Sequence, residues 1–203
     1  MQQSKKVRYI IVLFLLGVSV VALVGWNICV GTVRIPLADI FASIRGEKIE
    51  NSRILWDIRM PRTLAAMILG GALALAGYLL QTFFHNPIAG PFVLGISSGA
   101  KLFVAVVMIV FLRYSRTLSS VDLIVAAFAG SMLSMFCVLL MSPRVQNMSF
   151  LVLIGVMIGY ICSAVTDFLV TFAEDSDIVN LHNWSMGSFS GMSWEHIRIM
   201  TII

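Results

Sequence analysis

Long hydrophobic runs alternate with short polar intervals along this chain. The runs cover residues 9–33, 63–84, 92–112, 123–141 and 148–171. About 20 consecutive apolar residues in an α-helix cross the hydrocarbon core of a bilayer. The pattern therefore predicts an all-α, polytopic membrane helix bundle with about five complete transmembrane helices.

The two ends of the chain need separate interpretation. Lys5, Lys6 and Arg8 precede the first run, as they would in a signal peptide. That run is longer than the roughly 7–15 apolar residues of a signal peptide, so we favour an uncleaved first transmembrane helix. Residues 199–203 resemble the start of a sixth transmembrane helix. We therefore expect the 203-residue sequence to be a truncated part of a longer protein.

The longest polar interval, residues 34–60, has an amphipathic centre. Leu37, Ile40, Phe41 and Ile44 recur at the spacing of one helical face, and Pro36 stands near the first turn. The spacing predicts a short helix on the membrane surface. We expect residues 34–60 to be an external amphipathic segment within a single transmembrane domain that covers residues 1–203.

Composition supports a membrane protein and excludes several other classes. Hydrophobic residues make up 59% of the chain and charged residues 12%, against about 45–50% and about 25% in soluble domains. No basic run with interleaved aromatics suggests nucleic-acid binding. The sequence has no catalytic motif and no metal-binding cluster, so we expect no catalytic residue, no metal and no cofactor. The partner implied by composition alone is membrane lipid.

Small residues mark two candidate helix-packing faces. Gly70, Gly71 and Gly77 lie in a run rich in alanine, and Gly155 and Gly159 are spaced one helical turn apart. Membrane helices associate through close backbone approach at such residues. Both segments are therefore predicted to pack against protein.

Lys101 and Asp167 are the two charges inside the runs. Lys101 lies roughly 9 Å along its helix if that helix begins near Gly95, within reach of the nearer membrane surface. It either extends to that surface or serves as a polar pathway residue. Asp167 lies roughly 30 Å along its own helix. If both helices begin at one surface, the two charges differ in depth and form no ion pair.

The distribution of basic residues conflicts with the simplest orientation. Lys5, Lys6 and Arg8 favour a cytoplasmic N-terminus, yet most other arginines then fall outside the membrane. A functional need for external arginines would resolve the conflict.

Several short motifs resemble one family when taken together and in order. They are Arg59-Met60-Pro61-Arg62, Gly71 to Gly77 (GALALAG), Gln81, Asn86 to Pro91 (NPIAGP), Leu94 to Ala100 (LGISSGA), and Trp184 with Gly187-Ser188 and Trp194. This series resembles the permeases of ATP-binding-cassette importers for ferric siderophores, haem and cobalamin. The resemblance covers essentially the whole chain, about the first three fifths of a family member.

The resemblance implies a ten-helix permease in the bacterial cytoplasmic membrane. Two permease subunits, identical or different, form one pathway, separate cytoplasmic ATPase subunits drive it, and an extracytoplasmic binding protein delivers the substrate. The permease itself is not an enzyme. A ferric siderophore is the expected substrate, on family frequency. A secondary transporter or channel without ATPase partners is the alternative, and a structural membrane scaffold is a third possibility.

The resemblance also implies roles for particular residues. Arg59 and Arg62 dock the binding protein. The cytoplasmic gate and pathway include Asn147, Met148, Ser149, Gly155 and Gly159. The cytoplasmic turn includes Gln81, Asn86, Pro87 and Pro91.

Overall fold

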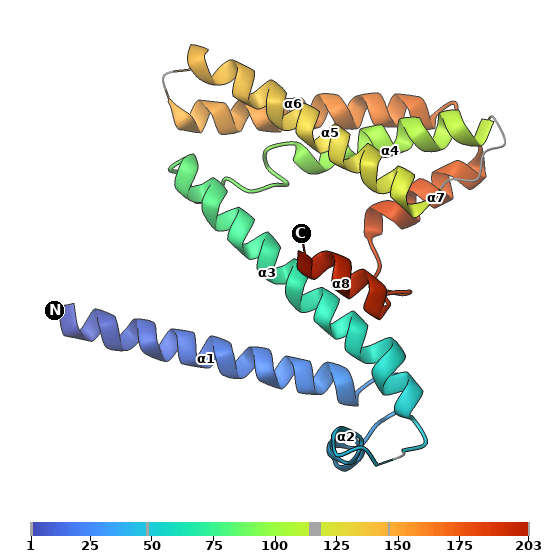
Figure 1. Ribbon diagram of the computed structural model, residues 1–203. Helices are drawn as coiled ribbons and strands as arrows, with labels where there is room; N and C mark the ends of the chain where they lie inside the picture. Colours follow the sequence, from blue (N-terminus) through green and yellow to red (C-terminus); the bar gives the residue numbers. More distant parts are fainter. Residues whose placement is uncertain (1, 48, 114–118, 146, 203) are drawn as a thin grey trace. The chain divides into compact units, whose positions relative to one another are not determined.

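The computed structural model describes residues 2–47, 49–113, 119–145 and 147–202, and this part of the chain contains helices and connecting loops but no strand (Figure 1). The all-α prediction is confirmed. The chain divides into two compact units, residues 1–71 with 189–203, and residues 72–188. Each unit is described by itself.

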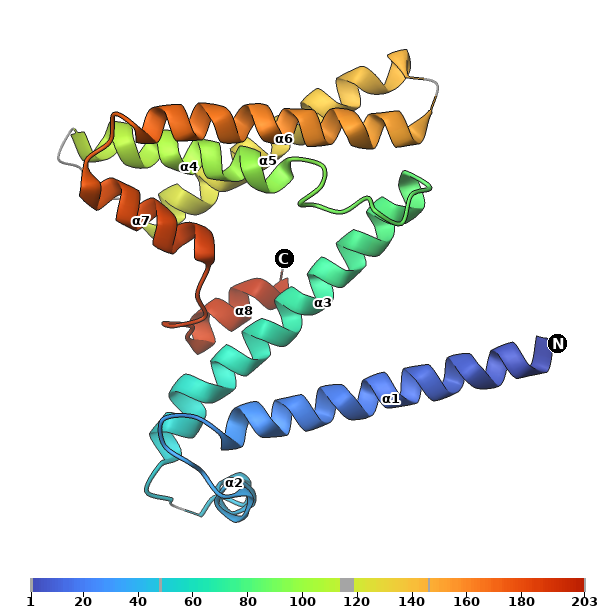
Figure 2. The same ribbon diagram turned by 180° about the vertical axis from the view of Figure 1, so that it is seen from behind.

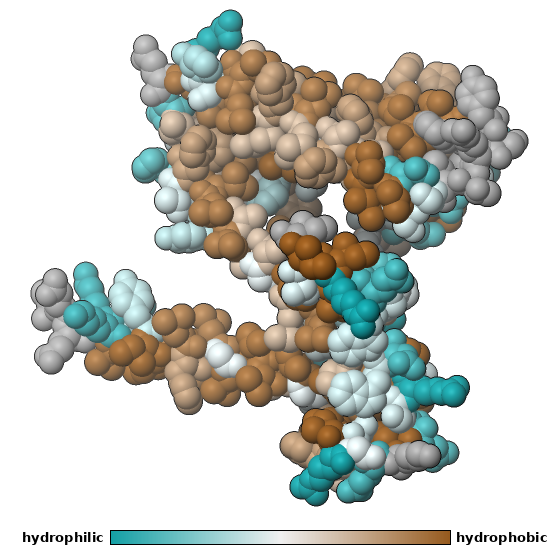
Figure 3. All heavy atoms as spheres, viewed as in Figure 1, coloured by the Kyte–Doolittle hydropathy of each residue, from teal (hydrophilic) through white to brown (hydrophobic). Residues whose placement is uncertain are grey.

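The first unit holds the N-terminal helix and its short neighbours. It contains α1 (Gln2–Cys29), α2 (Leu37–Ile44), the π-helix η1 (Ile54–Arg59), the first part of α3 (Met60–Phe83) and α8 (Trp194–Ile202). Its core consists of Ile28, Ile35, Ile40 and Leu55. Along α1 the surface is mostly hydrophobic (Figure 3), which fits a helix that faces lipid.

The π-helix before α3 has a local chemical cause. Pro61 has no N–H group and cannot donate the hydrogen bond that an α-helix requires at its position. The N–H of Met60 donates to the carbonyl of Leu55, five residues back. The backbone is therefore wider just before α3, in the segment that ends at Arg59.

The second unit is a packed helix bundle. It contains the remainder of α3, α4 (Ile96–Arg113), α5 (Ser120–Met141), the 3-10 turn η2 (Ser142–Arg144), α6 (Met148–Val170) and α7 (Asp175–Met186). Helix α4 packs against α5, α6 and α7. Helices α4, α5 and α6 lie side by side in both views (Figures 1 and 2). One core cluster surrounds Phe84, Leu94 and Leu151, and another surrounds Val104, Ala105 and Leu181.

Most predicted helices agree with the structure, with one shortened span. Four helices in the described residues are long and apolar enough to cross a membrane, namely Lys5–Cys29, Ile54–Phe83, Ser120–Arg144 and Met148–Val170. The apolar part of α4, Ile96–Val110, is shorter. The predicted span began at Phe92, but residues 91–95 form turns after Pro91. The predicted helix near residues 36–44 is confirmed as α2, whereas α7 was not predicted.

Candidate docking site and helix crossing

The two arginines of the predicted docking pair have different environments. Arg59 is buried, with 9% of its surface exposed. Its guanidinium group donates hydrogen bonds to the carbonyl groups of Ile28 and Val33, at the end of α1 and in the loop that follows. A helix end leaves backbone carbonyls without partners, and Arg59 supplies partners there. Arg59 is therefore a structural link in the first unit, and its geometry does not support the predicted docking role.

Two further contacts hold Arg59 in this position. Thr63 donates from its hydroxyl group to the Arg59 carbonyl, 2.8 Å away, and lies 2.9 Å from the side-chain oxygen of Asn27 on α1. Gly31 leaves room for the guanidinium group, because a Cβ at Gly31 would lie 2.7 Å from an Arg59 nitrogen. The end of α1, the loop after it and the start of α3 are thus joined around one cation.

Arg62 is exposed and available to a partner. Its Nε donates a hydrogen bond to the carbonyl of Phe189 at 3.3 Å. Other exposed arginines in the first unit are Arg8, near the N-terminus, and Arg34, Arg45, Arg53 and Arg198. The docking role of Arg62 stays a prediction, and of the Arg59–Arg62 pair only Arg62 is exposed.

The predicted turn after α3 is present and has a defined geometry. The N–H of Asn86 donates to the Gln81 carbonyl at 3.1 Å, and the N–H of His85 donates to the Thr82 carbonyl at 3.3 Å. Together with the left-handed backbone of His85, at φ 49°, these bonds form a Schellman motif. The Asn86 side chain then accepts from the N–H of Ile88. Pro87 is exposed and Pro91 half-buried in the following loop.

Three residues anchor the loop between this turn and α4 in the core of the second unit. Phe84, Ala89 and Leu94 are fully buried against residues of α5 and α6. Non-helical backbone is tolerated at membrane depth only where protein or a water-filled cavity surrounds it. The buried side chains of Phe84, Ala89 and Leu94 meet that condition on the side of the loop that faces the bundle, whereas Pro87, Ile88 and Phe92 are exposed.

Gly95 meets the middle of α6 rather than its start. A Cβ added to Gly95 would lie 2.8 Å from the Gly155 carbonyl oxygen and 2.8 Å from the Gly159 nitrogen. These two glycines lie roughly 10–16 Å along α6 from Met148. Helix α4 therefore begins partway along α6, and the predicted common starting level of these two helices is wrong.

A second close approach joins α4 to α5. A Cβ at Gly99 would lie 2.6 Å from the Gly130 carbonyl oxygen, and a Cβ at Gly130 would lie 2.8 Å from the Phe103 Cβ. The prediction that Gly155 and Gly159 pack closely is confirmed. The corresponding prediction for α3 is not supported, because a Cβ at Gly70, Gly71 or Gly77 would meet no described atom within 4 Å.

The shifted start of α4 also changes the position of Lys101. The hydroxyl groups of Ser98 and Ser163 lie 3.4 Å apart, and Lys101 and Asp167 follow them by three and four residues. Positions three and four apart lie on the same side of a helix. At about 1.5 Å per residue, Lys101 lies about 4.5 Å beyond this contact along α4 and Asp167 about 6 Å beyond it along α6, which places the two residues at similar levels. The expectation that the two charges differ in depth is wrong, whereas among the described residues no ion pair joins Lys101 and Asp167, as expected.

The predicted gate residues lie at the start of α6. Asn147 precedes the helix, and its side-chain oxygen accepts a hydrogen bond from the N–H of Ser149 at 3.0 Å. Met148 and Ser149 are exposed. Gly155 and Gly159 are instead covered by Leu94 and Gly95. Their predicted place in the pathway thus has no open surface in this unit, while the gate role of residues 147–149 stays a prediction.

Sequence reasoning missed two structural features, helix α7 and the burial of Arg59. It did not predict α7, whose Leu181 packs into the second core cluster. The acidic residues Asp175 and Asp177 in its first turn were a usable signal, because acidic side chains favour helix N-termini. The burial of Arg59 had no comparable signal, since it depends on contacts with α1.

The fold and these contacts define a polytopic, all-α membrane protein. Residues 11–203 match the model of the FecCD transport family, so the chain belongs to this family.

Two curated relatives match nearly the whole of this chain. The vitamin B12 import system permease protein BtuC of Salmonella paratyphi A is 36% identical over 199 residues, which are 98% of this chain and 57% of that protein. BtuC of Salmonella arizonae is 35% identical over 202 residues, 100% of this chain and 58% of that protein. The chain thus spans less than three fifths of the length of these relatives.

A solved structure shares the fold. It is described as "An inward-facing conformation of a putative metal-chelate type ABC transporter", with a TM-score of 0.73 and 23% sequence identity. The match covers 94% of this chain and 57% of that chain. At this level of identity the similarity establishes the helical arrangement only.

Proposed function

We propose that this chain belongs to the permease subunit of an ATP-binding-cassette importer in the bacterial cytoplasmic membrane. The observation that carries the proposal is the match of residues 11–203 to the FecCD transport family. The BtuC relatives, named for vitamin B12 import, support an importer. The apolar helices of both units supply the membrane-spanning part.

The permease works with three kinds of partner in this proposal. A second permease subunit completes the pathway, ATPase subunits bind at the cytoplasmic side, and a binding protein docks outside. The permease itself is not an enzyme, because ATP hydrolysis belongs to the separate subunits. The residues 147–149 at the start of α6 contribute to the cytoplasmic gate.

The proposed substrate is a bulky metal chelate. A ferric siderophore follows from the family resemblance, and cobalamin is the substrate in the names of the relatives. The described residues contain no group of three or more His, Cys, Asp or Glu side chains placed to hold a metal ion. Recognition of the chelate as a whole, rather than of its metal, is the mode we propose.

The alternative of a secondary transporter is less well supported. The common level of Lys101 and Asp167 removes one argument against it, because paired charges within the membrane occur in such transporters. Family membership nevertheless favours the importer.

Docking outside the membrane gives the first test. Acidic groups of a binding protein would pair with Arg62, whose charge lies at the surface. We expect Arg62→Glu in the intact permease, reconstituted in lipid nanodiscs, to raise the Kd for its binding protein about tenfold.

Arg144→Glu is the matched control for this experiment. Arg144 is also exposed, but it follows α5 at the surface assigned to the cytoplasm. The control should bind the binding protein as the wild type does. Equal affinities for wild type and Arg62→Glu, or an equal loss in both variants, would contradict the docking assignment.

A further inference from the structure

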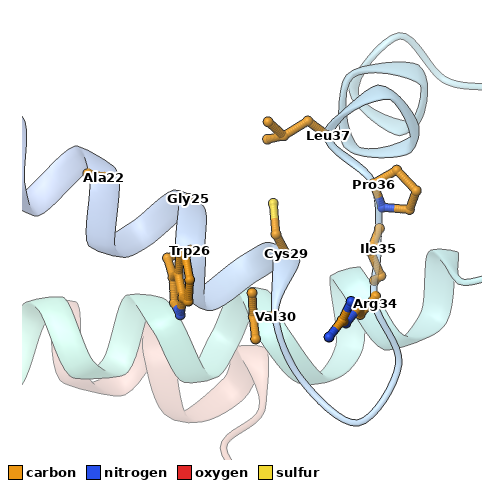
Figure 4. Close-up of a pocket in the computed structure, with 9 residues that line it drawn as sticks. All are labelled: Ala22, Gly25, Trp26, Cys29, Val30, Arg34, Ile35, Pro36 and Leu37. Carbon is orange, nitrogen blue, oxygen red and sulfur yellow. The ribbon is translucent and has the colours of Figure 1, made fainter.

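An apolar groove lies where α1 gives way to α2. Its volume is about 800 Å³, and it is lined by Ala22, Gly25, Trp26, Cys29, Val30, Arg34, Ile35, Pro36 and Leu37. In Figure 4 the side chains of Cys29 and Leu37 extend into the space between the end of α1 and the start of α2. Arg34 supplies the single charged side chain among these residues.

Arg34 is exposed at this groove and has no hydrogen-bond or ion-pair partner among the described residues. Its position differs from that of Arg59, which donates to two backbone carbonyls nearby. Arg34 therefore keeps its donors available at the end of a hydrophobic wall. A guanidinium group offers a planar, two-pronged donor that matches a phosphate.

The groove lies at the level where the apolar run ends. Residues 9–33 carry no charge, so Arg34 is the first charged residue after the predicted span. Trp26 is 70% exposed one turn before the helix ends, and tryptophan favours the headgroup level of a bilayer. A lipid beside α1 would therefore place its acyl chains along the helix and its headgroup near Arg34.

Helix α2 extends the same apolar surface. Leu37, Phe41 and Ile44 each have about three fifths of their surface exposed, whereas Ile40 and Ser43 are buried. The predicted apolar face of this helix is thus directed mainly outward, as in helices that lie in the membrane interface.

We infer that this groove binds an anionic phospholipid of the surrounding membrane. One acyl chain lies along the wall formed by Ala22, Trp26 and Cys29, and the phosphate accepts hydrogen bonds from the Arg34 guanidinium. The apolar wall alone would not distinguish one lipid from another, because all of them carry similar acyl chains. The preference for an anionic headgroup comes from Arg34. The inference does not depend on the proposed import activity.

Fluorescence quenching by brominated lipids tests this site directly. The intact protein is reconstituted in phosphatidylcholine vesicles that contain phosphatidylglycerol, with bromine on the acyl chains of one lipid or the other. The Trp26 signal is isolated as the difference between wild type and Trp26→Phe. At equal mole fraction, we expect brominated phosphatidylglycerol to occupy the site about fivefold more than brominated phosphatidylcholine.

Two variants separate the charge from the fold. Arg34→Gln should abolish the preference, and Arg34→Lys should keep part of it because the charge remains. Arg45→Gln removes an exposed arginine after α2 that does not line the groove, and should keep the full preference. Unchanged melting temperatures show that each variant is folded.

Three results would overturn the inference. The first is equal occupancy by the two lipids in the wild type. The second is a preference that survives Arg34→Gln or disappears equally in Arg45→Gln. The third is an absence of quenching at Trp26 by either lipid, which would show that another protein surface, including a second copy of this chain, covers the groove.

Discussion

Gly95 stands against Gly159 so closely that a Cβ on Gly95 would lie 2.8 Å from the Gly159 backbone nitrogen. This contact makes α4 begin beside the middle of α6. Residues 84–95 therefore reach that level without a continuous helix. The crossing fixes which positions of α4 and α6 share a level.

Gly95→Ala should strongly destabilise the second unit. Gly95 combines a positive φ of 73° with contact to two backbone groups that cannot move aside. The left-handed backbone costs about 1–2 kcal/mol, and overpacking adds about 1–3 kcal/mol. Thermal unfolding in detergent should show a clear loss of melting temperature.

Gly46→Ala is the matched control for that substitution. Gly46 has a φ of 86°, but a Cβ there would meet nothing within 4 Å. Gly46→Ala should lower the free energy of unfolding only by the cost of the left-handed backbone, about 1–2 kcal/mol. If both variants lost the same stability, the close crossing at Gly95 would be refuted.

Substitution of Arg59 should lower stability much more than substitution of Arg62, because Arg59 is buried and Arg62 is exposed. Arg59→Gln leaves the buried carbonyl of Ile28 and the partly buried carbonyl of Val33 with poorer partners, at a cost of about 3 kcal/mol. Arg62→Gln changes an exposed side chain and should cost less than about 0.5 kcal/mol. Melting temperatures of the two variants check this difference, and a stable Arg59→Gln protein would argue against the buried link.

His85 should tolerate glycine better than a β-branched residue. Its φ of 49° lies in the left-handed region at the end of α3, where helices commonly place glycine. His85→Gly should keep or slightly raise stability, whereas His85→Val should lower it by about 1–2 kcal/mol. Equal melting temperatures for the two variants would contradict the left-handed turn.

Lys101 and Asp167 should be energetically coupled. Each lies one turn beyond the Ser98–Ser163 contact, on neighbouring helices. A double-mutant cycle with Lys101→Met and Asp167→Asn should give a coupling of about 0.5–1 kcal/mol in unfolding free energy. The same cycle with Lys101→Met and Asn147→Ala, at the opposite end of α6 from Asp167, serves as a control. Additive effects of the first pair would mean that the charges do not interact.

Helix existence was largely predictable from the sequence, because long apolar runs have few structural alternatives in a membrane. The amphipathic helix α2 and the turn between Gln81 and Asn86 followed from spacing and from proline and asparagine chemistry. The start of α4 did not, because it depends on how Gly95 fits the backbone of α6.

The different environments of Arg59 and Arg62 could not be predicted from the sequence pattern either. Arg59 and Arg62 flank the same proline, and their chemistry is identical. Burial of Arg59 arises from the end of α1, about 30 residues earlier in the chain. Motif resemblance identified both residues, but only tertiary contacts distinguish the internal link from the exposed charge.

ATP-dependent uptake in proteoliposomes tests the proposed function most directly. The intact permease is reconstituted with its ATPase subunits, and its binding protein is added outside with radiolabelled ferric siderophore or cobalamin. We predict accumulation of one chelate that requires both ATP and the binding protein. Uptake that persists without ATP and follows an ion gradient, or no uptake of any metal chelate by the assembled complex, would contradict the importer.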